Sequence, residues 1–264
     1  MPEENGQGRR PWLDVSSLVI EVTRRCNLDC DHCLRGDAEN ADMDARTLDT
    51  FLRHVKRIST VTFSGGEPSL NIPLIREFYR LCDKYDIPVY SFFVATNGMA
   101  NQEELTLLLL DQYAKLPDAE CRANCGVALS VDLFHEGAAW RCTEAKVPSR
   151  LVTGLAFYTD QKSHEDQSDL GWILPRGRAY ENGLAERTTK DAPDTRFVLE
   201  RCDDGVQAET LYLSANGRLY PDCNLSYEDM DAARDCPSDC PTMSIPVTEC
   251  LKDCVMALLE PNGN

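Results

Sequence analysis

Short apolar runs alternate with amphipathic segments along the first 190 or so residues of the chain. Runs rich in β-branched and aromatic residues predict strands over residues 17–23, 60–64, 88–95, 126–133, 150–158 and 171–174. Between them, apolar residues spaced by three and four predict helices over residues 43–58, 101–115, 136–145 and 178–187, with a further helix opened by Pro73. The pattern therefore predicts strand and helix in regular alternation.

Repeated strand–helix units imply a parallel sheet with helices outside it, because each crossover returns the chain to the same end of the sheet. About six units suit an α/β fold with a partial (β/α)6 barrel, whereas a closed barrel of eight units needs about 250 residues. Loops at the carboxyl ends of the strands build the active site in such folds. Three cysteines and the segments GGEP, TNG and SVD all follow predicted strands.

The alternation stops near Arg196. Asn216-Gly217 lies between two short apolar runs and predicts a hairpin, because this pair tolerates the positive φ angles of a tight turn. Residues 202–254 hold six of the thirteen cysteines, so we expect a small cysteine-rich C-terminal extension ordered by metal. The expected organisation is a polar tail over residues 1–12, the partial barrel over 13–192 and the extension over 193–264.

Composition excludes several classes of partner and location. The chain carries 27 Lys and Arg against 44 Asp and Glu, a formal net charge of −17, which disfavours nucleic acid and anionic membranes as partners. The N-terminus lacks the apolar region of a signal peptide, and no apolar run is long enough to span a membrane, so we expect a cytoplasmic protein. In that setting thirteen cysteines favour metal or iron–sulfur ligation over disulfides.

Cys26, Cys30 and Cys33 follow the first strand with the spacing C-x3-C-x2-C. Three thiolates on one loop can hold three irons of a [4Fe–4S] cluster and leave the fourth iron open for a substrate or cofactor. A zinc ion bound by these cysteines and His32 is the alternative.

The segment TRRCNLDCDHC after the first strand, followed by SGGEPSL after the second, resembles the radical S-adenosylmethionine (SAM) enzymes. The resemblance covers residues 13–184 and is strongest over 17–70; His32 stands where the family often has an aromatic residue. It implies that Cys26, Cys30 and Cys33 bind a catalytic [4Fe–4S] cluster whose open iron chelates SAM. Reductive cleavage of SAM then yields a 5′-deoxyadenosyl radical, which abstracts hydrogen from a substrate.

The same resemblance implies a SAM-binding role for residues at three strand ends. Gly65 and Gly66 would let the backbone approach the cofactor, and Glu67 would pair with its ammonium group. Polar positions that contact the SAM carboxylate and ribose correspond here to Thr96, Ser130 and Asp132. The alternatives are a plain strand-to-helix turn at GGEP and a helix cap at TNG.

The tail resembles the auxiliary-cluster domains called Twitch and SPASM, which implies an auxiliary [4Fe–4S] cluster on four cysteines: Cys202, Cys223, Cys236 and Cys240. Structural zinc and reduced thiols are the alternatives. The tail has six cysteines where the full SPASM set has seven, and one extra residue precedes Cys223. The remaining candidates carry no assigned role: Cys121, Cys125, His135, Cys250 and Cys254.

The resemblance implies an oxygen-sensitive oxidoreductase that modifies a peptide or protein and receives electrons from a donor such as flavodoxin or ferredoxin. The alternatives are a radical SAM dehydrogenase of a small metabolite, a glycyl-radical activase, and a non-catalytic iron–sulfur or zinc-binding module.

Overall fold

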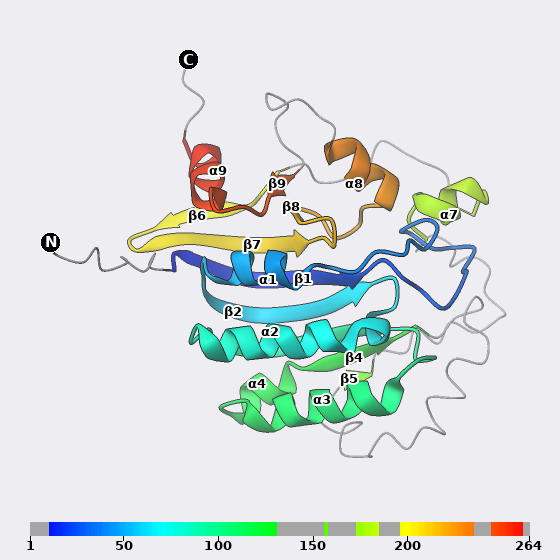
Figure 1. The fold of residues 1–264 in the computed structure, drawn as a ribbon, viewed down its shortest axis with the longest axis horizontal. Helices are drawn as coiled ribbons and strands as arrows, with labels where there is room; N and C mark the ends of the chain where they lie inside the picture. The colour runs from blue at the N-terminus through cyan, green and yellow to red at the C-terminus, as the bar shows by residue number, and fades with distance from the viewer. Residues whose placement is uncertain (1–10, 131–155, 158–172, 185–195, 235–243, 261–264) are drawn as a thin grey trace, which may run out of the picture.

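A mostly parallel, open sheet runs through the protein (Figure 1). The computed structural model describes residues 11–130, 156–157, 173–184, 196–234 and 244–260. Within these residues the sheet has nine strands, and its main path runs β5-β4-β3-β2-β1-β7-β8-β9, with β6 paired to β7. The expected α/β fold with an unclosed parallel sheet is confirmed.

The N-terminal half of the sheet follows the strand–helix alternation. Its strands are β1 (Leu13–Thr23), β2 (Val55–Gly65), β3 (Val89–Thr96), β4 (Gly126–Leu129) and β5 (Ala156–Phe157), all parallel to their neighbours. The connecting helices are α1 (Ala45–Leu52), α2 (Ile72–Lys84), α3 (Gln102–Lys115) and the short α4 (Ala119–Ala123), with one 3-10 turn, η1, over Pro68–Asn71. The carboxyl ends of β1, β2 and β3 therefore meet at one edge.

The C-terminal strands extend the same sheet on the other side of β1. They are β6 (Leu199–Cys202), β7 (Gly205–Leu213), β8 (Arg218–Tyr220) and β9 (Ile245–Pro246), followed by α9 (Leu251–Leu258). β7 runs parallel to β1, with Leu18 opposite Leu211, and turns back through Asn216-Gly217 into β8 as the hairpin signal predicts. Buried side chains of β7, β8, β9 and α9 share one apolar core with β1 and β2.

The helix predicted over 43–58 is shorter than expected. α1 ends at Leu52, and Val55 and Ile58 belong to β2, where buried and more exposed residues alternate. The carbonyl of His54 accepts hydrogen bonds from Trp12 and Leu13 at 2.9 Å each, so the chain is already aligned beside β1 there. Asp44 caps the helix by accepting a hydrogen bond from the Arg46 amide.

Several other predicted elements fall partly or wholly outside the described residues. The helix over 136–145 lies outside them, and only residues 156–157 of the predicted fifth strand are described. Ile173 and Leu174, the described part of the predicted sixth strand, are not in a strand. The helix predicted over 178–187 is α7, Gly177–Glu181. No helix in the described part of the chain is long and apolar enough to cross a membrane.

Candidate functional site

The three cysteines of the first motif lie in the loop that leaves the carboxyl end of β1, which we call the cysteine loop (residues 24–36). The Cys33 amide donates to the Cys30 carbonyl at 3.1 Å, and the Leu28 amide donates to Cys26 Sγ at 3.4 Å. All three cysteines are half-buried, and none of them forms a disulfide. Burial raises the pKa of the Cys26 and Cys33 thiols, so metal binding there would release their protons.

The three thiols of this loop are the candidate ligands of an iron–sulfur cluster. Among the described residues, no group of three His, Cys, Asp or Glu side chains could hold one metal ion. In a [4Fe–4S] cluster each thiolate binds a different iron. Cys26, Cys30 and Cys33 would hold three irons of such a cluster, and the fourth iron would have no ligand from this loop.

The GGEP segment at the end of β2 lies directly against the start of the cysteine loop. The Gly66 amide donates to the Thr23 carbonyl and the Glu67 amide to the Arg25 carbonyl, both at 2.8 Å. A Cβ on Gly65 would sit 2.1 Å from the Thr23 oxygen, and one on Gly66 would sit 2.2 Å from the Arg25 oxygen. Both glycines are thus required for backbone packing between two strand ends; their contact with SAM stays a prediction.

Glu67 is buried and receives its hydrogen bonds from within the protein. Its Oε1 accepts from the Ser69 amide at 3.0 Å and from Thr96 Oγ1 at 2.7 Å, and its Oε2 accepts from the Asn97 amide at 2.7 Å. A carboxylate offers about four acceptor positions, so one remains on Oε2 for a ligand. Glu67 therefore joins the GGEP segment to the TNG segment, whatever it also binds.

The TNG segment in turn reaches the cysteine loop. Asn97 Nδ2 donates to Asn27 Oδ1 at 3.0 Å and lies 3.9 Å from Cys26 Sγ. Sequence reasoning named Thr96 and passed over Asn97, although its place directly after Thr96 at the end of β3 was the available signal. The Ser130 amide donates to the Thr96 carbonyl at 2.9 Å, which brings Ser130 to the same edge. Asp132 lies outside the described residues.

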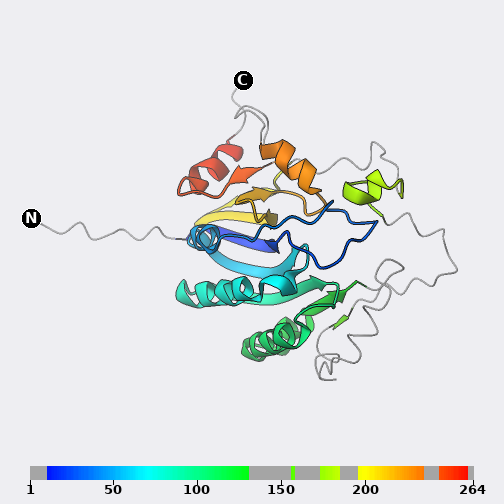
Figure 2. The ribbon, with the colours of Figure 1, turned by 45° about the vertical axis from the view of Figure 1, so that its right-hand side comes forward.

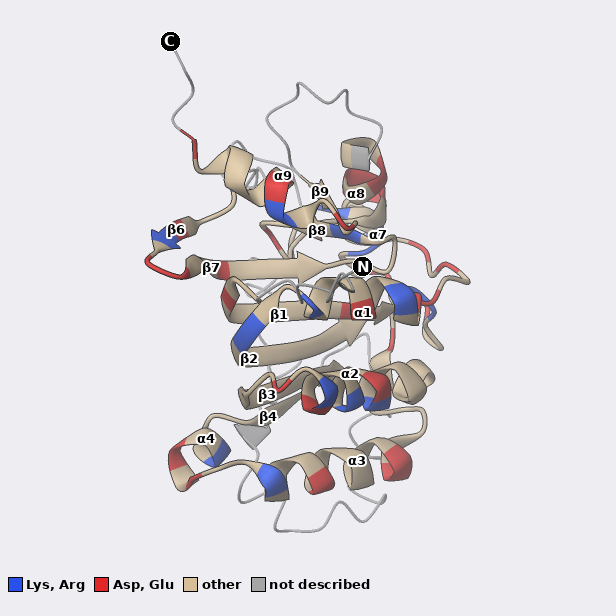
Figure 3. Ribbon diagram, turned by 60° about the vertical axis from the view of Figure 1, so that its left-hand side comes forward, with Lys and Arg blue, Asp and Glu red and all other residues tan. Residues whose placement is uncertain are grey.

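Helix α7 packs on the far side of the cysteine loop, as Figures 1 and 2 show. A Cβ on Gly177 would sit 2.4 Å from the Gly36 amide nitrogen and 2.7 Å from the Cys33 oxygen, and the Arg178 amide donates to that oxygen at 3.0 Å. The Arg178 guanidinium forms ion pairs with three aspartates of this region: Asp29, Asp31 and Asp37. Acidic residues accordingly gather in the loops beside α7 (Figure 3).

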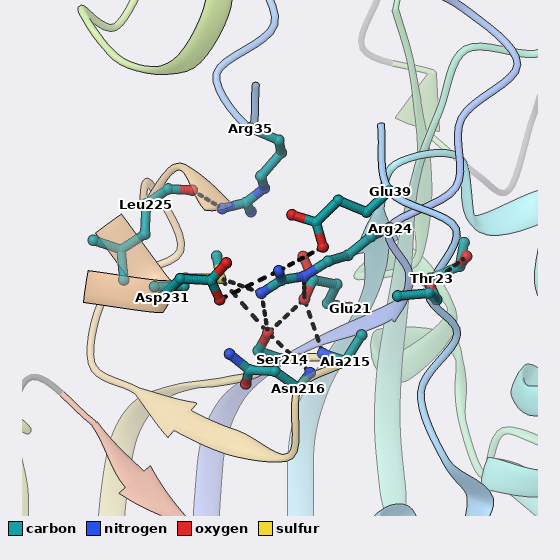
Figure 4. A network of polar contacts seen from close by, with 12 residues as sticks. Glu21, Thr23, Arg24, Arg35, Glu39, Ser214, Ala215, Asn216, Leu225 and Asp231 are labelled. Carbon is teal, nitrogen blue, oxygen red and sulfur yellow. Dashed lines mark hydrogen bonds and ion pairs between the residues drawn. The ribbon is translucent and has the colours of Figure 1, made fainter. Parts of the chain in front are cut away.

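Two buried arginines connect the cysteine loop to the C-terminal strands (Figure 4). Arg24 donates to Glu21 at 3.3 Å, to Glu39 at 2.9 Å and to Ser214 at 3.4 Å. Burial alone would lower the pKa of the Arg24 guanidinium, but Glu21 and Glu39 more than offset this and raise it. Arg35 donates to the carbonyl oxygens of residues 223 and 225.

Cys202 and Cys223 lie toward opposite ends of β7. Cys202 pairs with Gly205, which contacts Trp12 beside the amino end of β1, whereas the Cys223 carbonyl is bound by Arg35 of the cysteine loop. From Gly205 to Tyr212, the partner of Tyr220 in β8, the strand runs for roughly 23 Å at about 3.3 Å per residue. Contrary to the expectation of one shared cluster, the structure does not bring Cys202 and Cys223 together.

The other cysteines divide between the core, the surface and the undescribed residues. Cys82 and Cys125 are buried, and Cys125 Sγ accepts a hydrogen bond from the Phe92 amide of β3. Cys250 is exposed at the start of α9, and Cys254 on that helix packs against the core. Residues 236 and 240, the other two predicted auxiliary ligands, lie outside the described residues.

Proteins of known sequence and structure resemble parts of this chain. The uncharacterized protein MJ0907 of Methanocaldococcus jannaschii is 32% identical over 148 residues, 54% of this chain and 48% of that protein. YfkA of Bacillus subtilis is 26% identical over 77 residues, 28% of this chain and 21% of YfkA. The chain thus spans about half of the first relative and about a fifth of the second.

Two solved structures were also found by similarity of fold. His-tagged anSMEcpe with bound AdoMet covers 94% of this chain and 81% of its own, with 14% identity and a TM-score of 0.47. SuiB of Streptococcus suis, bound to its precursor peptide SuiA, covers 79% of this chain and 59% of its own, with 13% identity and a TM-score of 0.37.

Residues 20–135 match the family model of the Radical SAM superfamily. This range includes the cysteine loop, the GGEP segment and the TNG segment, which the structure joins through the contacts of Glu67 and Asn97. The chain is therefore similar to the Radical SAM superfamily over these residues, which make up less than half of its length.

Proposed function

We propose that this protein is a radical SAM enzyme that holds a [4Fe–4S] cluster on Cys26, Cys30 and Cys33 and acts on a peptide or protein. The observation that carries the proposal is the joining of three strand ends at one edge of the sheet. GGEP contacts the end of β1 through the Thr23 carbonyl and the cysteine loop through the Arg25 carbonyl, and TNG contacts this loop through Asn97. These are the parts that a cluster and its SAM require side by side.

When bound, the cluster and SAM supply a 5′-deoxyadenosyl radical able to remove hydrogen from a substrate. The residues of the chain bind the cluster and SAM and orient them. The three thiolates fix the cluster, and the free acceptor position on Glu67 Oε2 suits the ammonium group of SAM. Ser130, tied to Thr96, offers a hydroxyl at the same edge for the SAM carboxylate or ribose.

The proposal of a peptide or protein substrate is based on the cysteine-rich C-terminal region. This region resembles auxiliary-cluster domains of enzymes with such substrates. An auxiliary cluster there would use Cys223 with Cys236 and Cys240 and a ligand other than Cys202, because Cys202 lies at the far end of β7. An electron carrier such as flavodoxin or ferredoxin is the proposed donor.

The first experiment is anaerobic reconstitution with iron and sulfide, followed by incubation with SAM and dithionite. We expect a [4Fe–4S] absorption and spin-resonance signal, and formation of 5′-deoxyadenosine and methionine. The Cys26→Ala/Cys30→Ala/Cys33→Ala variant should form neither product, whereas the control Cys121→Ala, on the separate helix α4, should form both. An intact cluster that never cleaves SAM, or zinc in place of iron, would refute the proposal.

The substrate class needs a second experiment. Candidate peptides and candidate metabolites are incubated separately with the reconstituted enzyme, SAM and reductant, and are followed by mass spectrometry. A mass change in a peptide that requires both SAM and reductant supports the proposal. The same dependence found for a small metabolite alone would place the protein among the metabolite dehydrogenases.

A further inference from the structure

Within the cysteine loop, one arginine precedes the three cysteines and another follows them, and the radical SAM reaction as proposed gives neither arginine a role. Arg24 stands two residues before Cys26, and Arg35 stands two residues after Cys33. Their exposures are 3% and 8%, although charged side chains are rarely buried unless they are paired. The partners of both arginines lie largely in the segment that comprises β7, β8, α8 (Tyr227–Arg234) and the loops between them, which we call the C-terminal unit.

The Arg35 side chain donates hydrogen bonds to the main chain of the segment that leads from β8 to α8. One arm of its guanidinium donates to the Leu225 carbonyl and the other donates to the Cys223 carbonyl at 2.7 Å. The guanidinium lies 4.8 Å from the centre of the Tyr212 ring of β7. The main chain adds a further link, because the Tyr227 amide donates to the Arg35 carbonyl at 2.9 Å.

Arg24 makes the matching connection at the other end of the loop. Its guanidinium lies 4.4 Å from the centre of the Tyr227 ring, donates to Ser214 Oγ and faces Asp231 at 3.6 Å. The charge is balanced by Glu21 of β1, which is fully buried and also accepts from the Tyr212 hydroxyl at 2.9 Å and the Ala215 amide at 2.8 Å. Figure 4 shows the side chains of Glu21, Arg24, Ser214 and Asp231 converging between β1 and the end of β7.

We infer that Arg24 and Arg35 are positioning residues that fix both ends of the cysteine loop to the C-terminal unit, so that the geometry of the bound cluster depends on residues about 190 positions away. The inference rests on the proposed function, since the cluster is the group whose geometry is set. Both residues act through the loop, and neither is one of the proposed cysteine ligands.

Arginine suits this role for a chemical reason. Its planar fork can donate to two carbonyl oxygens at once while its face stacks on an aromatic ring. Lysine carries the same charge but lacks the fork and the planar face. Arg35→Lys therefore keeps the positive charge but loses the paired hydrogen bonds to the two carbonyl oxygens and the stacking on the Tyr212 ring.

The test compares reconstituted full-length variants: Arg35→Lys, Ser214→Ala and the control Arg53→Lys, whose arginine lies half-exposed beyond the end of α1. The readouts are the spin-resonance spectrum of the reduced cluster with and without SAM, its reduction potential, and circular dichroism. We expect Arg35→Lys to keep the wild-type dichroism, to broaden or shift the cluster spectrum, and to cleave SAM at least tenfold more slowly. The control should match wild type.

Ser214→Ala decides the case if Arg35→Lys does not fold. It removes one hydroxyl of the C-terminal unit, far from the cysteines in sequence. Because this hydroxyl contacts Arg24 and Glu21, its loss should still shift the spin-resonance spectrum or the reduction potential of the cluster. Spectra and potentials of both folded variants identical to wild type would overturn the inference. A wild-type protein without a SAM-responsive cluster would instead refute the proposed function, so the two failures are distinct.

Discussion

At the scale of single residues, the carboxylate of Glu67 shows how a sequence motif can have a structural role of its own. It accepts from Ser69, Thr96 and Asn97, and it is 1% exposed. The position of Glu67 at a strand end was predictable from GGEP alone. Its partners in TNG were not, because they lie about 30 residues away and depend on how β2 and β3 pair.

Glu67→Gln should therefore destabilise the protein even before any cofactor binds. The amide NH2 of glutamine is a donor, and it would replace one of the two oxygens that accept hydrogen bonds from Ser69, Thr96 and Asn97. We expect a loss of about 1–3 kcal/mol in the free energy of unfolding of the cluster-free protein, measured with urea. The control Glu77→Gln, which breaks only a surface pair with Arg80, should cost less than about 1 kcal/mol. Equal effects of the two variants would contradict the role assigned to Glu67.

At the scale of elements, periodicity located most strands and helices of the N-terminal half. It failed at α1, where the spacing of Val55 continues a helical stripe but the residue belongs to β2. The deciding contacts are hydrogen bonds from Trp12 and Leu13 to the His54 carbonyl, which pair residues about 40 positions apart. Local spacing does not contain such information.

The packing of α7 on the cysteine loop gives a prediction at this scale. Gly177 and Gly183 both have positive φ angles, 51° and 67°, so alanine strains the backbone at either position. Only at Gly177 would the new Cβ also overlap neighbouring backbone, at Gly36 and Cys33, while nothing lies within 4 Å at Gly183. We expect Gly177→Ala to destabilise the protein by about 1–3 kcal/mol more than Gly183→Ala.

Hydrogen exchange supplies the local measurement for this pair. Exchange at the Gly36 and Arg178 amides, which donate to the Cys33 carbonyl, should accelerate in Gly177→Ala and stay near wild type in Gly183→Ala. Unchanged protection of both amides in Gly177→Ala would show that α7 tolerates the added methyl group.

At the scale of the whole molecule, β7 lies inside the sheet, between β1 and β8. The change of pattern near Arg196 and the Asn-Gly hairpin were visible in the sequence. The parallel pairing of β7 with β1 was not, since it joins the first strand to one of the last without any local signal. For the same reason the sequence could not tell that Cys202 and Cys223 lie far apart.

A fragment that ends at residue 192 should consequently fail to fold. It would expose the β1 edge and remove the buried partners of Leu13, Val15 and Leu18, among them Val206, Ala208 and Leu211. We expect an insoluble product, or a soluble one without cooperative thermal unfolding by circular dichroism. A well-folded fragment that binds iron through its three cysteines would instead establish residues 13–192 as an independent domain.

The pairing of the first strand with a strand near the C-terminus also orders events during synthesis. While the ribosome is still making the middle of the chain, β1 already emerges, but its neighbour β7 does not yet exist. Contacts between residues this distant in sequence form late and slowly. The cysteine loop thus acquires its anchoring partners only after residues 212–231 have been synthesised, about 190 residues after the loop itself.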